Sequence, residues 1–593
     1  MNQPAAPLPL PTPAMTSEEA VLLLVSPPSP YALHRERIGG AEFTVFSHAP
    51  RNLATLYALS SMHDQRTMLV YEDESYRFPE VRQRAANLAY HLVHDLGVKK
   101  GDRVALAMRN LPEWIFTYMA VTSIGVVVVP LNGWWTGPEL RYGLADSGAK
   151  LLIADGERAR RVLPELEGSD VRVLIARTDD PPAPARALEP LLHGEHALPE
   201  IDVAPDDDAS IMYTSGSTGH PKGVVSTHRA IVSAVITWEV VLFGRLLAEL
   251  PPPAVARIQQ WLARGADSIA SRPFELPQAV GLITLPLFHV TGSNVQFLPA
   301  FRGGRKVVMM RKWNPERALE LIEREKVTDF GGVPTMSWEL VNSPEFQKRD
   351  TSTLRSLSAG GAARPPEHVK GLRDRASHAI PSTGYGMTET NSLGSAIGGD
   401  DYIARPASVG KALPPLIELK VIDEAGRTLG PDEDGEICIK GVSNMRCYWN
   451  QPEETAKVLH DGWMHTGDLG HIDSEGFLFI TGRAKDIVIR GGENIGCAEV
   501  EHALYEHPAV FEAAVYGVPD ARLGEALAAT VMVKPGQQLE VEELQAHVRA
   551  RLAAFKVPAH VTLQGESLPR VASGKIDKRS IRKLALERMG LRA

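Results

Sequence analysis

Cysteine is scarce in this sequence. Cys438, Cys447 and Cys497 are the only three among 593 residues, and no two of them form a CxxC pair. An odd count without such pairs disfavours both a disulfide framework and a cysteine-based zinc site. A reducing compartment suits this cysteine usage best, so we predict a cytoplasmic protein.

Long apolar runs and an excess of basic residues are also lacking. No apolar run reaches the ~18 residues that a membrane-spanning helix needs. No Lys or Arg precedes Arg35, although a secretory signal begins with basic residues. The formal net charge is -9, from 63 basic and 72 acidic residues. Since nucleic-acid phosphates require a basic face, we expect neither a nucleic-acid partner nor a transmembrane segment.

The sequence does contain a regular alternation of strand-like and helical segments. Apolar, strand-like runs at 67–71, 103–108 and 126–130 are separated by segments with helical spacing at 78–95 and 111–124. Strands that alternate with helices in this way predict a mostly parallel, doubly wound sheet.

The length predicts more than one domain, because a single core stops growing near ~250–300 residues. We interpret the proline- and acid-rich stretch 177–208 as a surface linker, with a second α/β unit beginning near residue 210. The predicted fold class is α/β. Its parts are a flexible leader and N-terminal arm (1–50), a large domain of doubly wound α/β subdomains plus a β-rich segment (51–484), and a small α+β domain (485–593).

The strongest local signal is the loop from Tyr213 to Gly223, which is rich in glycine and hydroxyl side chains. Its glycines let successive N–H groups face phosphate oxygens, and Lys222 adds a positive charge. An ordinary Ser/Gly surface loop is the alternative, but the lysine disfavours it. A Walker loop has Ser or Thr after the lysine, where this chain has Gly223. The candidate phosphate-binding residues are Thr214, Ser215, Gly216, Ser217, Thr218, Gly219 and Lys222.

This loop closely resembles the phosphate-binding loop of the adenylate-forming superfamily, which includes acyl-CoA synthetases, luciferases and peptide-synthetase adenylation domains. Further segments resemble the motifs of that family in the same order, over about residues 50–585. The pattern is most like that of fatty-acyl-CoA ligases. The resemblance implies an AMP-forming ligase that uses ATP, Mg²⁺ and coenzyme A.

Two segments resemble the part of the family site that holds adenine and magnesium. In the first, the resemblance implies that Tyr385 packs on adenine beside Gly386, that Thr388 contacts the α-phosphate, and that Glu389 binds Mg²⁺. An aromatic face suits a base, and a carboxylate oxygen suits a hard cation. In the second, small residues leave room for a flat ligand: Gly360, Gly361 and Ala362.

Later segments resemble the ribose motif and the C-terminal catalytic motif. By resemblance, Asp468 accepts hydrogen bonds from the ribose hydroxyls, Arg483 makes a second ribose or phosphate contact, and Lys575 is the catalytic lysine. The chemistry agrees with this assignment. A carboxylate substrate is already ionised at neutral pH, so adenylation needs no general base. It needs positive charge, because one anion must approach a polyanion.

Three residues resemble the elements that let the family's small domain move. Lys485 falls at the hinge between the two domains, and Gly491 and Gly492 resemble the loop that faces the thiol channel. The resemblance therefore implies that the small domain is mobile. Cys497 stands where the family usually has proline, and we expect a packing difference there.

A second departure from the family is the long stretch from Trp238 to Gln278. It contains three consecutive prolines and an amphipathic helix near 254–265. We keep three interpretations open: a lid over the acyl tunnel, a membrane-facing surface, and a plain surface excursion. Peripheral membrane contact and a homodimer both remain open.

The segment at 285–289 resembles the entrance of the family's acyl pocket, and His289 resembles the gate between the acyl and thiol channels. A structural role for His289 is the alternative. Amino-acid-activating relatives have an aspartate near this position, whereas this chain has Phe288 and His289. Most of the neighbouring residues are apolar or small, which favours a fatty or other hydrophobic acid. They are Val290, Gly292, Val333, Met336 and Leu393.

The leading hypothesis is a carboxylic acid–CoA ligase that forms an acyl-adenylate and pyrophosphate, then an acyl-CoA and AMP. One alternative is a stand-alone adenylating enzyme that loads a carrier protein in trans. Another is a nucleotide-binding protein without catalysis, which the retention of Lys222, Glu389 and Lys575 disfavours.

Overall fold

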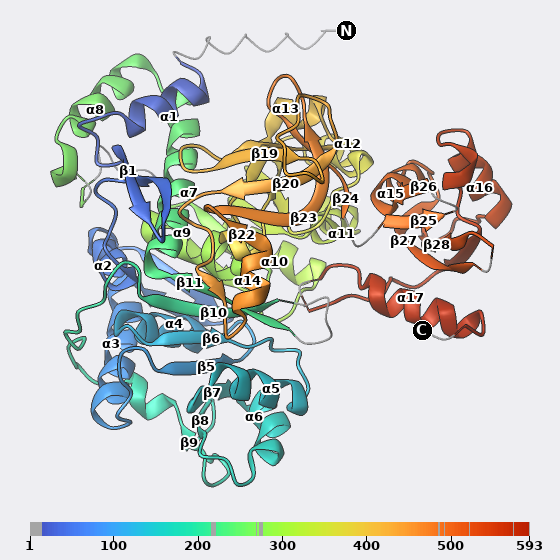
Figure 1. Cartoon of the computed structure of the whole chain (residues 1–593). Coiled ribbons are helices and arrows are strands. Elements are labelled where there is room, and N and C mark those ends of the chain that lie inside the picture. The colour runs from blue at the N-terminus through green and yellow to red at the C-terminus, as the bar shows by residue number, and fades with distance from the viewer. Residues whose placement is uncertain are drawn as a thin grey trace.

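The computed structural model describes residues 15–214, 221–268, 270–271, 277–483, 487–490, 493–520, 522–572 and 574–591. These residues form a large domain and, to one side of it, a small C-terminal domain (Figure 1). Strands and helices alternate through most of the large domain, and the small domain combines a mixed sheet, in which β28 and β29 are parallel, with helices. The predicted α/β fold class is confirmed.

The first sheet of the large domain has eight strands, and its central strands are parallel. Val127, Val128 and Val129 are all buried, as expected for strands covered by helices on both faces. In sheet order the strands are β21 (Cys447–Tyr448), β11 (Lys222–Thr227), β10 (Asp208–Thr214), β6 (Val127–Pro130), β5 (Arg103–Ala107), β7 (Leu151–Asp155), β8 (Arg172–Ala176) and β9 (Arg186–Ala187).

The second sheet joins a parallel half to an antiparallel, β-rich half. The change of direction occurs where β16 meets β17. The strands are β19 (Glu418–Ile422), β20 (Gly435–Lys440), β23 (Trp463–Ile472), β24 (Leu478–Arg483), β18 (Ser408–Ala412), β17 (Ser395–Gly398), β16 (Ile380–Tyr385), β15 (Ser356–Gly360), β14 (Asp329–Gly332), β12 (Val280–Ile283), β13 (Lys306–Met309), β3 (Thr67–Tyr71) and β4 (Glu74–Arg77), with β22 (Leu459–His460) beside β23.

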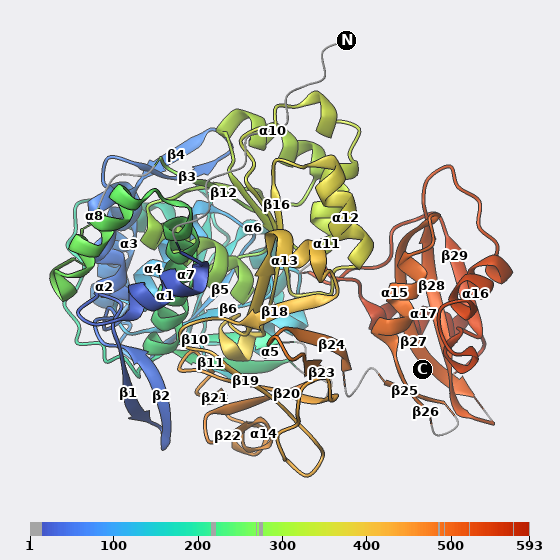
Figure 2. The same ribbon diagram turned by 90° about the horizontal axis from the view of Figure 1, so that it is seen from above.

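Helices surround the strands of the large domain, and the small domain stands to one side of it when viewed from above (Figure 2). The helix α4 is buried along its whole length, because both of its faces pack inside the large domain. Helices of the large domain include α2 (Leu53–Ala58), α3 (Phe78–His94), α4 (Pro112–Ser123), α5 (Gly137–Ser147), α6 (Gly156–Val162), α9 (Leu298–Gly303), α10 (Pro315–Glu325), α11 (Pro334–Asn342), α12 (Pro366–Arg375), α13 (Gly399–Ala404) and α14 (Pro452–Val458).

Two expectations about how the chain divides into units were wrong. The strand at 67–71 belongs to the second sheet, where β3 pairs with β13. The strand near 210 does not open a second unit, because β10 pairs with β6 and continues the first sheet. The stretch 177–208 is also more than a surface linker, since Leu188 and Leu192 are buried and Asn87 of α3 donates hydrogen bonds to its backbone.

The part of the N-terminal arm that the structure describes begins at residue 15. It forms α1 (Ser17–Val25) and a hairpin of β1 (Leu33–Ile38) and β2 (Ala41–Phe46). Ala20 and Leu24 are fully buried. A Cβ added to Gly244 would lie 2.7 Å from Val21, so α1 packs closely on α7 (His228–Glu249).

Helix α7 is the one helix in the described residues with the length and apolar composition to cross a membrane, and 67% of its apolar window is buried inside the protein. The following helix, α8 (Pro252–Leu262), turns its apolar side inward as well. Trp261 of α8 packs near Tyr31 and Phe243, with ring centroids 6.2 and 5.9 Å apart. The exposed positions of α8 are mixed in character: Pro252, Pro253, Ala256, Arg257, Gln259 and Gln260.

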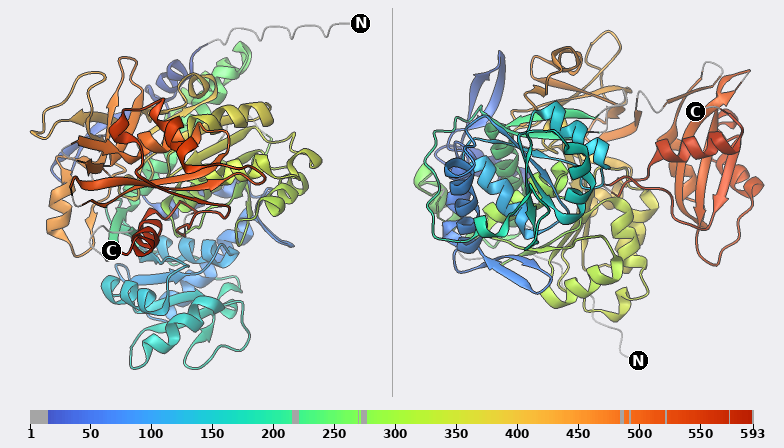
Figure 3. Two further views of the ribbon diagram at one scale, coloured as in Figure 1. Left: turned by 90° about the vertical axis from the view of Figure 1, so that its right-hand side faces the viewer. Right: turned by 90° about the horizontal axis from the view of Figure 1, so that it is seen from below.

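In its described residues, the small domain has a five-stranded sheet and three α-helices. When the molecule is viewed from the side of the small domain, this sheet lies in front of the large domain. The cyan part of the large domain lies below it (Figure 3, left). Cys497 is buried at the first position of α15, so it packs in the core of this domain. The elements are β25 (Ile487–Arg490), β26 (Glu493–Gly496), α15 (Cys497–Tyr505), β27 (Val510–Asp520), β28 (Gly524–Val533), α16 (Val541–Arg549), β29 (His560–Gln564) and α17 (Lys578–Arg588).

Candidate active site

Asp468 is the centre of a hydrogen-bonded group on the β-rich half of the second sheet. It lies in β23, directly opposite Arg483 at the end of β24. Arg483 Nε donates to Asp468 Oδ1 at 2.6 Å, and the Tyr385 hydroxyl donates to Oδ2 at 2.6 Å. Burial, and then Asp468, raise the pKa of Tyr385 well above its usual value. The structure thus brings together three residues that the sequence assigned to adenine and ribose.

Lys575 reaches this group from the small domain. Its side chain lies against Gly361, since a Cβ built on Gly361 would be 3.0 Å from Cε and 3.3 Å from Nζ. Gly361 also has a φ of +77°, which disfavours any other residue. Burial, and then Arg483, lower the pKa of Lys575 to about 8, while Asp468 opposes the shift. The ammonium group is therefore charged at neutral pH, and it lies within electrostatic reach of Arg483 and Asp468 of the large domain.

His289 lies close enough to Lys575 for the charge of the lysine to affect its pKa. Burial, and then Lys575, lower the pKa of His289 to about 3, so its imidazole is neutral at pH 7. Its Nε2 is buried without a hydrogen-bond partner in the described part of the chain. The next residues form η5 (Thr291–Phe297), a π-helical segment of the kind that recurs at functional sites. This unpartnered nitrogen gives His289 a polar group to offer a ligand.

Glu389 is a buried carboxylate beside the end of β21. Its Oε1 accepts a 2.8 Å hydrogen bond from the Tyr448 hydroxyl, and the residue is 6% exposed. Burial raises the pKa of Glu389, whereas Tyr448, Arg483 and Lys222 oppose the rise. A buried carboxylate with a raised pKa favours a cation at its side. The surroundings of Glu389 therefore fit the predicted binding of Mg²⁺.

The two ends of the phosphate loop are fixed by a β-hairpin. Thr214 closes β10 and lies opposite Lys222, which opens β11. Lys222 Nζ forms an ion pair with Glu454 and lies 5.0 Å from the centroid of the Tyr448 ring. Five predicted loop residues lie outside the described residues: Ser215, Gly216, Ser217, Thr218 and Gly219. The hairpin nevertheless holds Lys222 near Glu389, as the shared Tyr448 contact shows.

The small residues predicted beside adenine stand at the ends of neighbouring strands. Gly360 of β15 lies opposite Gly384 of β16, and Gly361 and Ala362 follow directly. Gly386 cannot carry a side chain, because its Cβ would lie 2.6 Å from the backbone of Ser392. Thr388 begins the short turn η7 (Thr388–Thr390), which contains Glu389. The hinge and thiol-channel candidates Lys485, Gly491 and Gly492 lie outside the described residues.

Several supporting residues gave no signal in the sequence. Glu436 accepts hydrogen bonds from the backbone of Gly467 and lies 3.0 Å from His465 Nδ1, so it supports the turn before Asp468. Asn110 donates to the carbonyl of Leu285 and accepts from the N–H of Leu287, which fixes the segment leading to His289. These contacts join residues far apart in the chain, so local spacing does not reveal them.

A cavity of about 180 Å³ lies between the loop that carries Lys575 and the large domain. Its lining includes Phe288, Met336, Gly574, Arg109 and Trp134. The Arg109 guanidinium lies 4.5 Å from the centroid of the Trp134 ring. The cavity therefore combines apolar and cationic surfaces next to the catalytic candidates.

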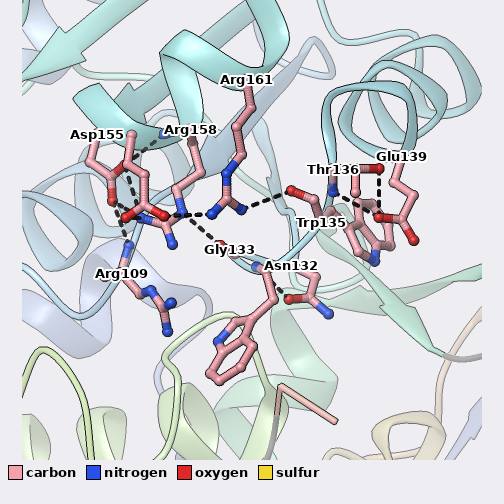
Figure 4. A network of polar contacts seen from close by, with 11 residues as sticks. Arg109, Asn132, Gly133, Trp135, Thr136, Glu139, Asp155, Arg158 and Arg161 are labelled. Atoms are coloured by element: carbon pink, nitrogen blue, oxygen red, sulfur yellow. Dashed lines mark hydrogen bonds and ion pairs between the residues drawn. The ribbon is translucent and has the colours of Figure 1, made fainter. Parts of the chain in front are cut away.

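The cavity side that carries Trp134 is held by the network in Figure 4. Asp155, at the end of β7, accepts hydrogen bonds from the Arg109 backbone and from fully buried Arg158. Arg158 Nε in turn donates to the carbonyl of Gly133 at 2.6 Å. The loop between β6 and α5 is thereby fixed at the carboxyl end of the parallel sheet, where ligands bind in open α/β folds.

Comparison with known proteins matches the chain to two family models. Residues 58–449 match the AMP-binding enzyme family, and residues 499–575 match the AMP-binding enzyme C-terminal domain. A feruloyl-CoA synthase from Amycolatopsis sp. is 36% identical over 508 residues, covering 85% of this chain and 93% of that protein. A long-chain-fatty-acid–CoA ligase from Bacillus subtilis is 33% identical over 547 residues, covering 87% and 91%.

Solved structures agree in fold. The o-succinylbenzoate CoA synthetase of Bacillus subtilis, in complex with its acyl-adenylate intermediate, has a TM-score of 0.72 and 28% identity, and covers 90% of this chain and 98% of its own. An amide bond synthetase from Marinactinospora thermotolerans has a TM-score of 0.75 and 28% identity, with coverage of 90% and 99%. The chain belongs to the AMP-binding enzyme family, in which it is an AMP-forming acyl-CoA ligase.

Proposed function

We propose that this ligase activates a hydrophobic carboxylic acid as an acyl-adenylate and transfers the acyl group to coenzyme A. One observation carries the proposal: Lys575 of the small domain is enclosed next to the Asp468–Arg483 pair of the large domain. A charged lysine between a ribose-binding carboxylate and the neutral His289 lies where an acid and a nucleotide phosphate would meet.

In the first step, a carboxylate oxygen attacks the α-phosphorus of ATP, and the bond to the pyrophosphate oxygen breaks. Both reactants are anions, so the step needs positive charge at the point of attack. Lys575 supplies it from the small domain, and Lys222 supplies it at the phosphate loop. Bound Mg²⁺ would neutralise phosphate charge beside Glu389. Because His289 is uncharged, it does not compete with Lys575 for the anions.

In the second step, the thiol of coenzyme A attacks the acyl carbonyl carbon. The bond from that carbon to the phosphate oxygen breaks, AMP leaves, and the thiol proton passes to solvent. A thiol with a pKa of about 8.5 is partly ionised at neutral pH, so no strong base is required. We place the hinge at Lys485 and the thiol-facing loop at Gly491 and Gly492, on the motif resemblance alone.

The acid is proposed to be a fatty acid or another hydrophobic acid. The apolar side chains of Phe288 and Met336 in the cavity lining support this class. The relatives act on different acids by their names, including ferulate, long-chain fatty acids and indoleacetate. ATP–pyrophosphate exchange with saturated fatty acids of several lengths and with aryl acids tests the class. Exchange with short polar acids alone would contradict the proposal.

Loading of a carrier protein in trans is the alternative second step. The two acceptors separate when AMP release is measured with and without coenzyme A, because a CoA ligase turns over repeatedly only with it. We also propose a cytoplasmic location. This rests on Cys438, Cys447 and Cys497, none of which forms a disulfide.

A further inference from the structure

Arg570 joins the two domains through its guanidinium group. On the large domain it donates to the hydroxyl of Thr335 at 3.0 Å and forms an ion pair with Glu339 at 3.1 Å, both on α11. On its own domain it forms an ion pair with Glu512 and donates to the carbonyl of Gly574 at 2.9 Å. One side chain therefore contacts both domains and the loop that carries the catalytic lysine.

The carboxylate of Glu339, which accepts from Arg570 on the large domain, is oriented by a second hydrogen bond. Glu339 Oε2 accepts a 2.6 Å hydrogen bond from Trp313 Nε1, which leaves Oε1 for the guanidinium. The side chains of Glu339 and Arg570 are only 25% and 21% exposed, so solvent screens this pair less than a surface pair. Because other contacts orient both the guanidinium and the carboxylate, the hydrogen bond between Arg570 and Glu339 has a defined geometry.

Within the small domain, Arg570 keeps a second partner. The side chain of Glu512 is 3% exposed, and burial raises its pKa while Arg570 opposes that rise. Its Oε2 accepts a 2.9 Å hydrogen bond from the Leu568 backbone. Arg570 and Glu512 therefore stay together if the small domain moves, whereas the contacts with Thr335 and Glu339 must break.

The same arginine is connected to the position of Lys575. The chain folds back on itself here, with the Val571 N–H bonded to the Lys575 carbonyl and the Asp577 N–H bonded to the Pro569 carbonyl. At the tip of this turn, Gly574 has a φ of +83°, and its Cβ position lies 3.0 Å from Met336 of α11. Fixing Arg570 on α11 thus fixes the turn that presents Lys575.

We propose that Arg570, Thr335 and Glu339 form a latch that holds the small domain with Lys575 in place for adenylation, and that opens before thioester formation. These three are positioning residues, since they act through Lys575. The proposal rests on the two-step function above. The latch favours one domain arrangement over the other, so weakening it shifts the balance between the two half-reactions.

The test measures the half-reactions separately. Glu339→Gln preserves shape and removes the charge that Arg570 meets, and Thr335→Val removes the second contact. We expect Glu339→Gln to slow single-turnover adenylate formation by about 5- to 30-fold, the range for losing a charged hydrogen bond. Thioester formation from purified acyl-adenylate should stay within about twofold or become faster. The double variant, Glu339→Gln with Thr335→Val, should slow adenylate formation further while thioester formation remains unimpaired.

Controls separate positioning from stability. Glu345→Gln removes an exposed partner of Lys348 on the large domain and should change neither half-reaction. Arg570→Lys should restore more adenylation than Arg570→Ala, which also leaves Glu512 buried without its cation. Equal slowing of both half-reactions, or no slowing by Glu339→Gln, overturns the latch while the wild type still makes adenylate. A wild type that makes no adenylate overturns the proposed function and the latch with it.

Discussion

The ribose side and the magnesium side of the proposed nucleotide site each contain one buried carboxylate, but their partners differ. Asp468 is bonded to the cation Arg483 and to the Tyr385 hydroxyl. Glu389 is bonded to the neutral Tyr448 hydroxyl, and it forms no ion pair within the described part of the chain. The charge of Asp468 is compensated by the protein, whereas burial raises the pKa of Glu389.

This difference predicts different tasks for the two acids. A carboxylate with a built-in cation keeps its geometry without a ligand and suits directional hydrogen bonds to ribose hydroxyls. A buried carboxylate whose surrounding cations act only through space gains most from a metal ion placed beside it. Lys575 lies near Asp468 and Arg483, so it adds positive charge on the side where the protein already compensates the carboxylate.

Removing Lys575 should have the largest effect. We expect Lys575→Ala to slow adenylation by about 10²–10⁴-fold, because the site loses charge where two anions meet. Thioester formation from purified acyl-adenylate should change far less. Single-turnover assays of each half-reaction measure both. Lys583→Ala, an exposed lysine on α17, is the matched control and should behave as the wild type. Equal losses in both half-reactions would contradict the assigned role.

Replacing each acid by its amide should separate the two sides. Glu389→Gln should slow adenylation by about 10²-fold and raise the Mg²⁺ concentration needed for half-maximal rate, since an amide binds the cation weakly. Asp468→Asn should raise the KM for ATP and leave the Mg²⁺ requirement unchanged. Titrations of ATP–pyrophosphate exchange with Mg²⁺ and with ATP distinguish these outcomes. If both variants shift the Mg²⁺ requirement alike, the two acids share one task.

The local parts of this site follow from the sequence. The motifs around Tyr385, Asp468 and Lys575 carry the family resemblance that suggested their roles, and the structure brings all three together. Strand positions were also predictable, because the apolar runs at 104–107 and 127–130 are buried on both faces.

Sheet membership and supporting contacts were not predictable in the same way. Periodicity marks 67–71 as a strand but does not say that it pairs with β13, more than 200 residues later. Tyr448 reaches Glu389 across 59 residues, and Arg570 reaches Glu339 across 231. Such contacts depend on tertiary packing, and no local pattern encodes them.

The pH dependence of adenylation should follow the protonation of Lys575, which lies on the ribose side of the proposed site. The pKa of Lys575 is lowered to about 8, so its charge is present below that pH and is lost as pH rises. We expect the adenylation rate to fall about tenfold between pH 7 and 9. In Lys575→Arg the guanidinium stays charged, so the fall should disappear even if the rate is lower. A fall that persists in this variant belongs to another group.

The smallest effect should come from the hydroxyl on the magnesium side. Tyr448→Phe removes a hydrogen bond that lowers the pKa of Glu389. The substitution retains the aromatic ring beside Lys222. The pKa of Glu389 should rise further, so its carboxylate protonates more readily as pH falls. We therefore expect the variant to bind Mg²⁺ about fivefold more weakly than the wild type at pH 6, as measured by exchange titrations. At pH 8 the difference between variant and wild type should be smaller. Tyr516→Phe, which removes a hydroxyl contact with Thr530 in the small domain, is the control. An unchanged Mg²⁺ requirement in Tyr448→Phe at both pH values would mean that the protein does not tune Glu389 for a cation.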